Sequence, residues 1–127
     1  MLGLCLARGA ATLAIAASQF TLSWTHSIEK VRWEEHWRVT PAGLVVELAL
    51  IHGSGAGMEP PDGAVFAGGV WRYRPELPPQ PTVTLAASSF TADHTLCVGD
   101  DCRALQRWIA GSGPVRLSPC EVAARAP

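Results

Sequence analysis

The sequence predicts an all-β fold: an antiparallel β-sandwich or open barrel of seven to eight short strands, with one short C-terminal helix. Two observations carry this prediction. Apolar and polar residues alternate along most of the chain, which is the period of a strand with one buried face. Twelve Gly and ten Pro residues divide the 127-residue chain into short segments and disfavour long helices. An apolar content of 48% excludes a disordered chain, and the length suits one domain.

The first eighteen residues differ in composition from the rest. Residues 1–18 carry a single charge, at Arg8, and are rich in Leu and Ala. The apolar run over residues 13–17 ends in small residues, as the cleavage region of a secretory signal does. We therefore expect residues 1–18 to be a signal peptide or N-terminal anchor and residues 19–127 to form a single β-sandwich domain. The alternative is that this segment is a buried first strand or helix of the domain.

The two clearest strand patterns follow one another in the chain. Residues 20–26 alternate strictly between apolar or aromatic and small polar side chains, and residues 31–39 alternate again. If residues 27–30 form the loop of a hairpin, Trp24 and Trp33 lie opposite each other. The sequence thus predicts an antiparallel pair with a shared aromatic face.

Glu35 is unusual because the alternation places it between Trp33 and Trp37 on the apolar face, opposite Leu22. A carboxylate there loses hydration, which costs several kcal/mol unless a partner supplies hydrogen bonds. One interpretation is a structural carboxylate satisfied by backbone N–H groups or an arginine. The functional interpretation is a buried pair with His26, which requires a bend because the two residues are two pair-steps apart.

The remaining elements follow from the same pattern. After a turn at residues 40–43, one face of a third strand carries Leu44, Val46, Leu48, Leu50 and His52, with Glu47 on the opposite face. Further strands are expected over residues 71–74, 82–87, 94–98 and 115–117. The spacing of Ala104, Leu105, Trp108 and Ile109 predicts the short helix, which ends at Gly111.

Cysteine usage favours an oxidising compartment. Without residues 1–18, three cysteines remain: Cys97, Cys102 and Cys120. Cys97 and Cys102 flank a turn-rich tetrapeptide, so a hairpin there brings them within disulfide range. Cys102–Cys120 is the competing pair, and sequence does not decide between them. A zinc site lacks a second close Cys/His pair, so we expect no metal.

The most distinctive loop runs from His52 to Pro61. Its glycines, Gly53, Gly55 and Gly57, allow positive φ and close backbone approach, and Met58 follows them. The dinucleotide pattern fails at Met58, and the hydrolase elbow around Ser54 fails because position 52 is His. A backbone nest for an anion or a peptide carboxylate remains, beside the plainer interpretation of a tight loop that closes the sandwich.

The turn after the first strand gathers polar groups of interest. Ser27 and Glu29 can cap turn amides, but His26 and Ser27 point to opposite faces, so His26 is poorly placed to activate Ser27. His94 follows Asp93, which can orient its imidazole, although turn and strand roles explain both residues. We therefore expect no catalytic residues and no cofactor.

Several segments together resemble one family. They are Trp24-Thr-His-Ser-Ile-Glu29, Trp33-Glu-Glu35, Gly53-Ser-Gly-Ala-Gly-Met58, Leu96-Cys97 with Cys102, and Pro119-Cys120. The chain resembles an uncharacterised family of small exported bacterial domains, which are often encoded beside TAXI-type TRAP transporters. The resemblance spans residues 20–120, and the family has no assigned activity. It implies an accessory role near a solute-binding protein and its membrane permease.

These observations lead to a functional expectation. The chain carries 10 basic and 11 acidic residues, a balance that gives no electrostatic footprint for nucleic acid. We expect a non-enzymatic, periplasmic or otherwise exported module that assists a TAXI-type TRAP transporter by contacting the permease or its solute-binding protein. Membrane contact is expected only through residues 1–18, if these are retained.

The binding residues are expected to be His26, Ser27, Glu29, Glu35, Gly53, Gly55, Gly57 and Met58. The alternative is a small hydrolase or metal-dependent enzyme that uses His26, Glu35 and His94, and a purely structural role for the loop and the tryptophans is a third possibility.

Overall fold

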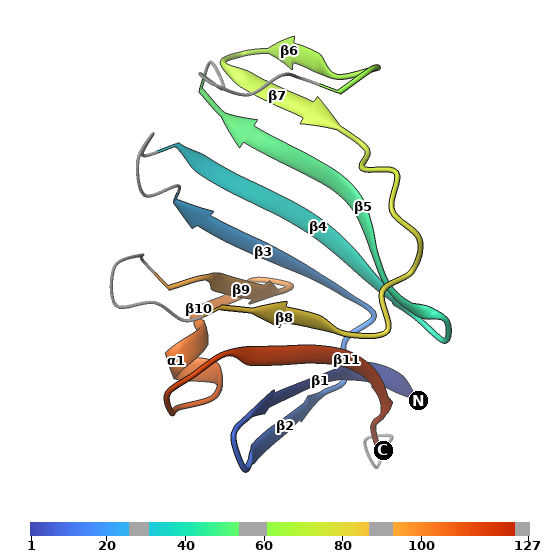
Figure 1. Cartoon of the computed structure of the whole chain (residues 1–127), viewed down its shortest axis with the longest axis vertical. Coiled ribbons are helices and arrows are strands. Elements are labelled where there is room, and N and C mark those ends of the chain that lie inside the picture. Colours follow the sequence, from blue (N-terminus) through green and yellow to red (C-terminus); the bar gives the residue numbers. More distant parts are fainter. Residues whose placement is uncertain (26–30, 54–60, 87–92, 124–127) are drawn as a thin grey trace.

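The computed structural model describes residues 1–25, 31–53, 61–86 and 93–123. They form two antiparallel sheets and one short helix, which confirms the predicted sandwich-like all-β architecture (Figure 1). The four-stranded sheet has the order β2-β1-β11-β8: Ala11–Ile15, Leu2–Arg8, Val115–Glu121 and Val83–Leu85. The seven-stranded sheet has the order β10-β9-β3-β4-β5-β7-β6: Asp101–Ala104, Thr95–Val98, Gln19–Thr25, Arg32–Thr40, Gly43–His52, Val70–Tyr73 and Val65–Ala67. None of the described helices has the length and apolarity needed to cross a bilayer.

The core lies between the two sheets. Its fully buried side chains come from both of them, and they include Leu4, Leu6 and Leu117 from the smaller sheet and Leu22 and Leu44 from the larger one. The smaller sheet covers only part of the larger one, so β5, β7 and β6 extend beyond it in the upper part of Figure 1. Phe66 on β6 is accordingly 45% exposed.

The segment expected to lie outside the domain is part of its structure. Residues 2–15 form β1 and β2, and β1 pairs with both β2 and β11. Leu4 and Leu6 are completely buried, because β1 occupies an interior position in the smaller sheet. The division expected at residue 18 is therefore not a boundary of the described fold, which has the alternative arrangement of a buried first strand.

Arg8 shows how closely this segment is integrated. Its guanidinium is buried and donates hydrogen bonds to Gly113 O at 3.0 Å, Ile109 O at 3.1 Å and Gln106 Oε1 at 2.9 Å. These bonds join the end of β1 to the short helix and to the segment between that helix and β11. A buried guanidinium with three acceptors is a structural group, and sequence analysis had treated it only as the charge of a targeting segment.

The cysteine pairing follows from the same arrangement. Cys97 and Cys102 are bonded, as predicted, across the directly opposed positions of β9 and β10, with a Cα–Cα distance of 4.0 Å. The competing Cys102–Cys120 pair does not form, because Cys120 is bonded to Cys5 with a Cα–Cα distance of 5.8 Å. This second bond links β1 to its neighbour β11.

The first predicted hairpin has the predicted register. Trp24 pairs with Trp33 and Leu22 with Glu35, and the indole rings of Trp24 and Trp33 stack with their centroids 6.1 Å apart. The predicted helix is α1 (Leu105–Trp108), whose last residue donates its indole N–H to Leu96 O at 2.9 Å.

One predicted strand face is wrong beyond its midpoint. Leu44 and Val46 are buried, but then Ala49 and Ile51 are buried in place of Leu48, Leu50 and His52. The cause is a β-bulge: His36 pairs with Leu48 and Trp37 with Val46, so Glu47 has no partner across the ladder. One extra residue moves every later side chain to the opposite face.

Candidate functional site

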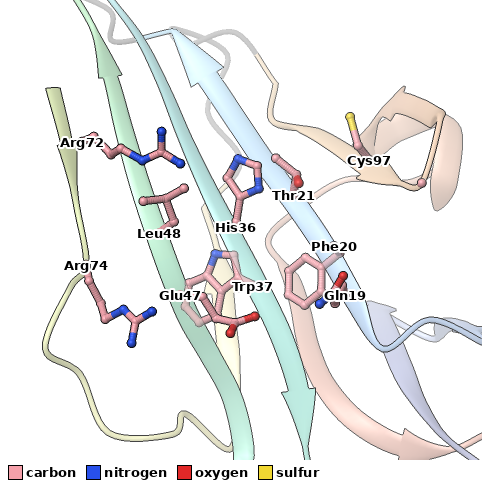
Figure 2. Close-up of a pocket in the computed structure, with 11 residues that line it drawn as sticks. Gln19, Phe20, Thr21, His36, Trp37, Glu47, Leu48, Arg72, Arg74 and Cys97 are labelled. Carbon is pink, nitrogen blue, oxygen red and sulfur yellow. The ribbon is translucent and has the colours of Figure 1, made fainter. Parts of the chain in front are cut away.

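A groove of about 640 Å³ crosses the face of the larger sheet that points away from the core (Figure 2). By register, Thr21, His36 and Leu48 lie side by side on this face and form the floor of the groove. Leu48 belongs to this face only because of the bulge at Glu47. The groove is lined by Gln19, Phe20, Thr21, His36, Trp37, Glu47, Leu48, Arg72, Arg74, Cys97 and Gly99.

Two arginines form one wall of the groove: Arg72 on β7, and Arg74 directly after the end of that strand. Arg72 lies opposite Leu50 on this face, and Arg74 follows two residues later (Figure 2). Both side chains are exposed, and in the described part of the chain neither forms an ion pair. Glu47 is the carboxylate in the groove, and its Oε2 is held 3.3 Å from Arg38 Nε. The groove therefore has an excess of positive charge.

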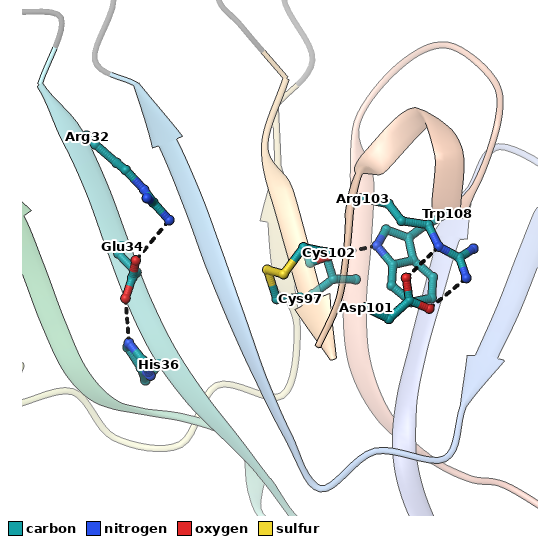
Figure 3. The surroundings of a disulfide bond; sticks show 9 residues. Arg32, Glu34, His36, Cys97, Asp101, Cys102, Arg103 and Trp108 are labelled. Atoms are coloured by element: carbon teal, nitrogen blue, oxygen red, sulfur yellow. Dashed lines mark hydrogen bonds and ion pairs between the residues drawn. A yellow bond between two sulfur atoms is a disulfide. The ribbon is translucent and has the colours of Figure 1, made fainter. Parts of the chain in front are cut away.

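The β9–β10 hairpin forms the opposite wall. Its Cys97–Cys102 disulfide lies on the groove face, because Cys97 is the register partner of Thr21 (Figure 3). Arg103 on β10 is bonded to Asp101 at 2.7 Å, and its guanidinium lies 4.2 Å from the ring centroid of Trp108. The cation–π contact joins this hairpin to α1.

The histidine on the groove floor is held by a carboxylate. His36 Nε2 lies 2.7 Å from Glu34 Oε2, and Arg32 donates to the other oxygen of Glu34 at 3.0 Å (Figure 3). The three residues alternate along β4 and share the face of the groove. Glu34 thus compensates the charge of Arg32 and orients the imidazole of His36.

Glu35 lies on the other face of the sheet, among aromatic side chains. It is half-buried, and it accepts a hydrogen bond from Trp37 Nε1 at 3.2 Å, which takes the place of the expected backbone or arginine donor. Loss of hydration raises the pKa of Glu35 above its ordinary value, and the bond from Trp37 opposes this shift. Burial, together with the charge of Glu35, raises the pKa of Tyr73.

Glu35 and His94 of the alternative enzyme function each contact a different tryptophan. The ring of His94 lies 5.2 Å from that of Trp24, centroid to centroid, whereas Glu35 is held by Trp37. Burial lowers the pKa of His94, and the neighbouring Asp93 opposes that shift. Asp93 itself accepts a hydrogen bond from the backbone N–H of Gln106 at 3.1 Å. Within residues 1–25, 31–53, 61–86 and 93–123, no three His, Cys, Asp or Glu side chains are grouped so as to hold a metal ion.

Comparison with protein families gives one match. The model of a domain of unknown function, DUF1850, matches residues 20–105, which is more than half of the chain. The chain belongs to the DUF1850 family. The match starts at the second residue of β3 and ends at the first residue of α1, so it contains β8 and the larger sheet except for Gln19. Neither the curated proteins nor the solved structures gave a match.

Most of the binding residues expected in this DUF1850 domain lie outside the described residues: His26, Ser27, Glu29, Gly55, Gly57 and Met58. Gly53 is described, with φ +106°, and its N–H donates to Gly69 O at 2.7 Å. Of the expected set, Glu35 and Gly53 are thus placed, on β4 and directly after β5.

The strand ends that flank the expected contact residues are close together. Thr25 pairs with Arg32, and Trp33 pairs with Ile51 two residues before Gly53. A Cβ atom at Gly53 would be 3.5 Å from the side chain of Val31. The two chain segments expected to carry the contact therefore leave the larger sheet at one end.

Sequence reasoning missed the groove of the DUF1850 domain. Arg72 and Arg74 alternate with Trp71 and Tyr73 in the sequence, which already places two arginines on one face of the strand expected over residues 71–74. Their relation to Leu48 depends on the bulge at Glu47, and the sequence carries no clear signal for that bulge.

Proposed function

We propose that this DUF1850 domain is a non-enzymatic interaction module that works outside the cytoplasm as an accessory of a TAXI-type TRAP transporter. Its partner is the permease or the solute-binding protein of that system. Two disulfides in so small a domain support an oxidising, exported environment. Family membership supports a shared role with other DUF1850 domains, and the transporter context is the proposed part.

One observation carries the choice of contact surface. The β3–β4 and β5 strand ends meet at one end of the larger sheet, where Val31 and Gly53 are neighbours. Binding residues of sandwich domains are commonly carried by the loops at one end of the scaffold. The contact end of the module is therefore the end marked by Thr25, Arg32 and Gly53.

Site-specific photo-crosslinking in cells that express the cognate transporter tests this proposal. A photoreactive residue replaces Arg32, which is exposed at the contact end, or Arg116, which is exposed on β11 of the other sheet. We expect position 32 to crosslink to the permease or the solute-binding protein and position 116 to crosslink to neither. Absence of both partners from the position-32 products, or equal yields at the two positions, would overturn the proposal.

An enzyme assay and a metal analysis test the alternative function, a small hydrolase or metal-dependent enzyme. Purified protein is analysed for bound metal, and Glu35→Gln and His94→Ala variants are compared with the parent in ester and peptide hydrolysis. If the parent hydrolyses a substrate and either variant does not, the small hydrolase is the better account of the function. Metal bound in a stoichiometric amount would favour the metal-dependent enzyme.

A further inference from the structure

We propose that the groove on the outer face of the larger sheet binds a small organic acid with two carboxylates, held by Arg72 and Arg74. The site lies on a sheet face and not at the contact end proposed above, so it adds a ligand that the interaction role does not require. Four properties of the groove carry the proposal.

The first property is uncompensated charge. Arg72 and Arg74 form no ion pair within the described residues, whereas the other charged groups nearby are paired: Arg38 with Glu47, and Arg32 with Glu34. The chain as a whole has a formal net charge of −1, so the positive charge of the arginine wall is a local feature of the molecule. An anion is the ligand that such a wall attracts.

The second property is the spacing of the two arginines. Arg72 lies on β7 and Arg74 is the first residue after that strand, so the two are alternate residues; in extended backbone such residues lie about 7 Å apart, Cα to Cα. Each guanidinium presents a planar fork of N–H donors that matches one carboxylate with two parallel hydrogen bonds. Two guanidinium groups carried by alternate residues suit two carboxylates joined by a short chain better than they suit one compact anion.

The third property is the floor. Leu48 is a half-exposed apolar side chain between the arginine wall and His36, and Thr21 lies beyond His36 (Figure 2). An apolar patch there suits the methylene chain between two carboxylates. The Thr21 hydroxyl, which has no hydrogen-bond partner among the described residues, can donate to one of them. A groove of about 640 Å³ is within the range of small-molecule sites.

The fourth property is rigidity. The arginine wall begins on β7, which is paired with β5, and the opposite wall is closed by the Cys97–Cys102 bond. The bulge at Glu47, which turns Leu48 into the groove, is held by the ion pair with Arg38. The backbone of both walls is thus in place before a ligand binds, and the ordering cost falls on the two arginine side chains.

Titration of the purified full chain with glutarate tests the proposal, by calorimetry and by the backbone amide shifts of Thr21 and Leu48. Butyrate, with one carboxylate, and inorganic phosphate are the comparison ligands. We expect glutarate to bind, with the shifts confined to the groove, and to bind more tightly than either comparison ligand. Affinity should fall as salt is added, because the two arginines are exposed.

Three variants locate the site. Arg72→Gln and Arg74→Gln should each weaken glutarate binding about tenfold or more, since each removes a charged pair of hydrogen bonds. Arg116→Gln removes the same charge from an exposed position on the other sheet and should leave the affinity within about twofold. No glutarate binding, equal or tighter binding of butyrate or phosphate, or equal losses in all three variants would each overturn the proposal. None of these measurements involves the transporter, so they succeed or fail independently of the proposed function.

Discussion

Removing the two disulfides separately should destabilise the domain by very different amounts. The Cys5–Cys120 bond joins residues 115 apart in sequence, and the Cys97–Cys102 bond joins residues 5 apart. A crosslink stabilises a fold chiefly by restricting the unfolded chain, and the entropy it removes grows with the logarithm of the closed loop. For these two loops the relation gives about 5 kcal/mol and about 2 kcal/mol.

The assay is urea unfolding at equilibrium of the parent, Cys5→Ala/Cys120→Ala and Cys97→Ala/Cys102→Ala, followed by tryptophan fluorescence. We expect the first double variant to lose about 3 kcal/mol more than the second. Its m value should also rise, because an unfolded chain without the long-range bond is more expanded. Thermal melting of the same proteins provides a second readout if the first variant is too unstable at 25 °C.

The reasoning fails if the two double variants are equally stable, or if the Cys97–Cys102 variant is the less stable one. Either result would mean that local geometry in the hairpin, and not restriction of the unfolded chain, dominates. The experiment also tests the N-terminal segment, because the larger loss requires that Cys5 belongs to the folded protein. Intact mass of the exported protein should accordingly show that Cys5 is retained and bonded.

Three further predictions concern single residues. Arg8→Met should cost about 3 kcal/mol of unfolding free energy in urea titrations, because the buried guanidinium donates three hydrogen bonds, and a loss below about 1 kcal/mol would contradict its structural role. Glu35→Gln should lower the pKa of Tyr73 in a titration at 295 nm, where the single tyrosine of the chain reports alone. Because the folded pKa of Glu35 is raised above 4.5, the parent should lose stability relative to this variant as pH rises from about 4.5 through the folded pKa, and a pH-independent difference would refute that shift. Gly43→Ala should lower the melting temperature more than Gly9→Ala, since a Cβ at Gly43 would be 2.7 Å from the Gln80 backbone whereas nothing lies within 4 Å at Gly9.

The sequence by itself determined the fold class and the first hairpin, and it offered the Cys97–Cys102 bond as one of two pairings. All three are local: alternation places side chains on a face, and a short turn fixes which residues lie opposite each other. The stacking of Trp24 on Trp33 and the position of Glu35 opposite Leu22 followed from those two facts.

Only the tertiary structure decided the features that depend on distant parts of the chain. An apolar segment such as residues 2–15 has the same composition in a targeting signal and in a buried strand, and only the tertiary structure shows that β1 pairs with β11. The Cys5–Cys120 bond depends on that pairing.

The groove depends on tertiary structure for a related reason. A bulge is one unpaired residue on a strand, so Glu47 leaves almost no trace in the alternation, yet it moves Leu48 to the face of Arg72. A period-two pattern predicts which residues share a face only while the register holds. The candidate ligand site exists because the register shifts once.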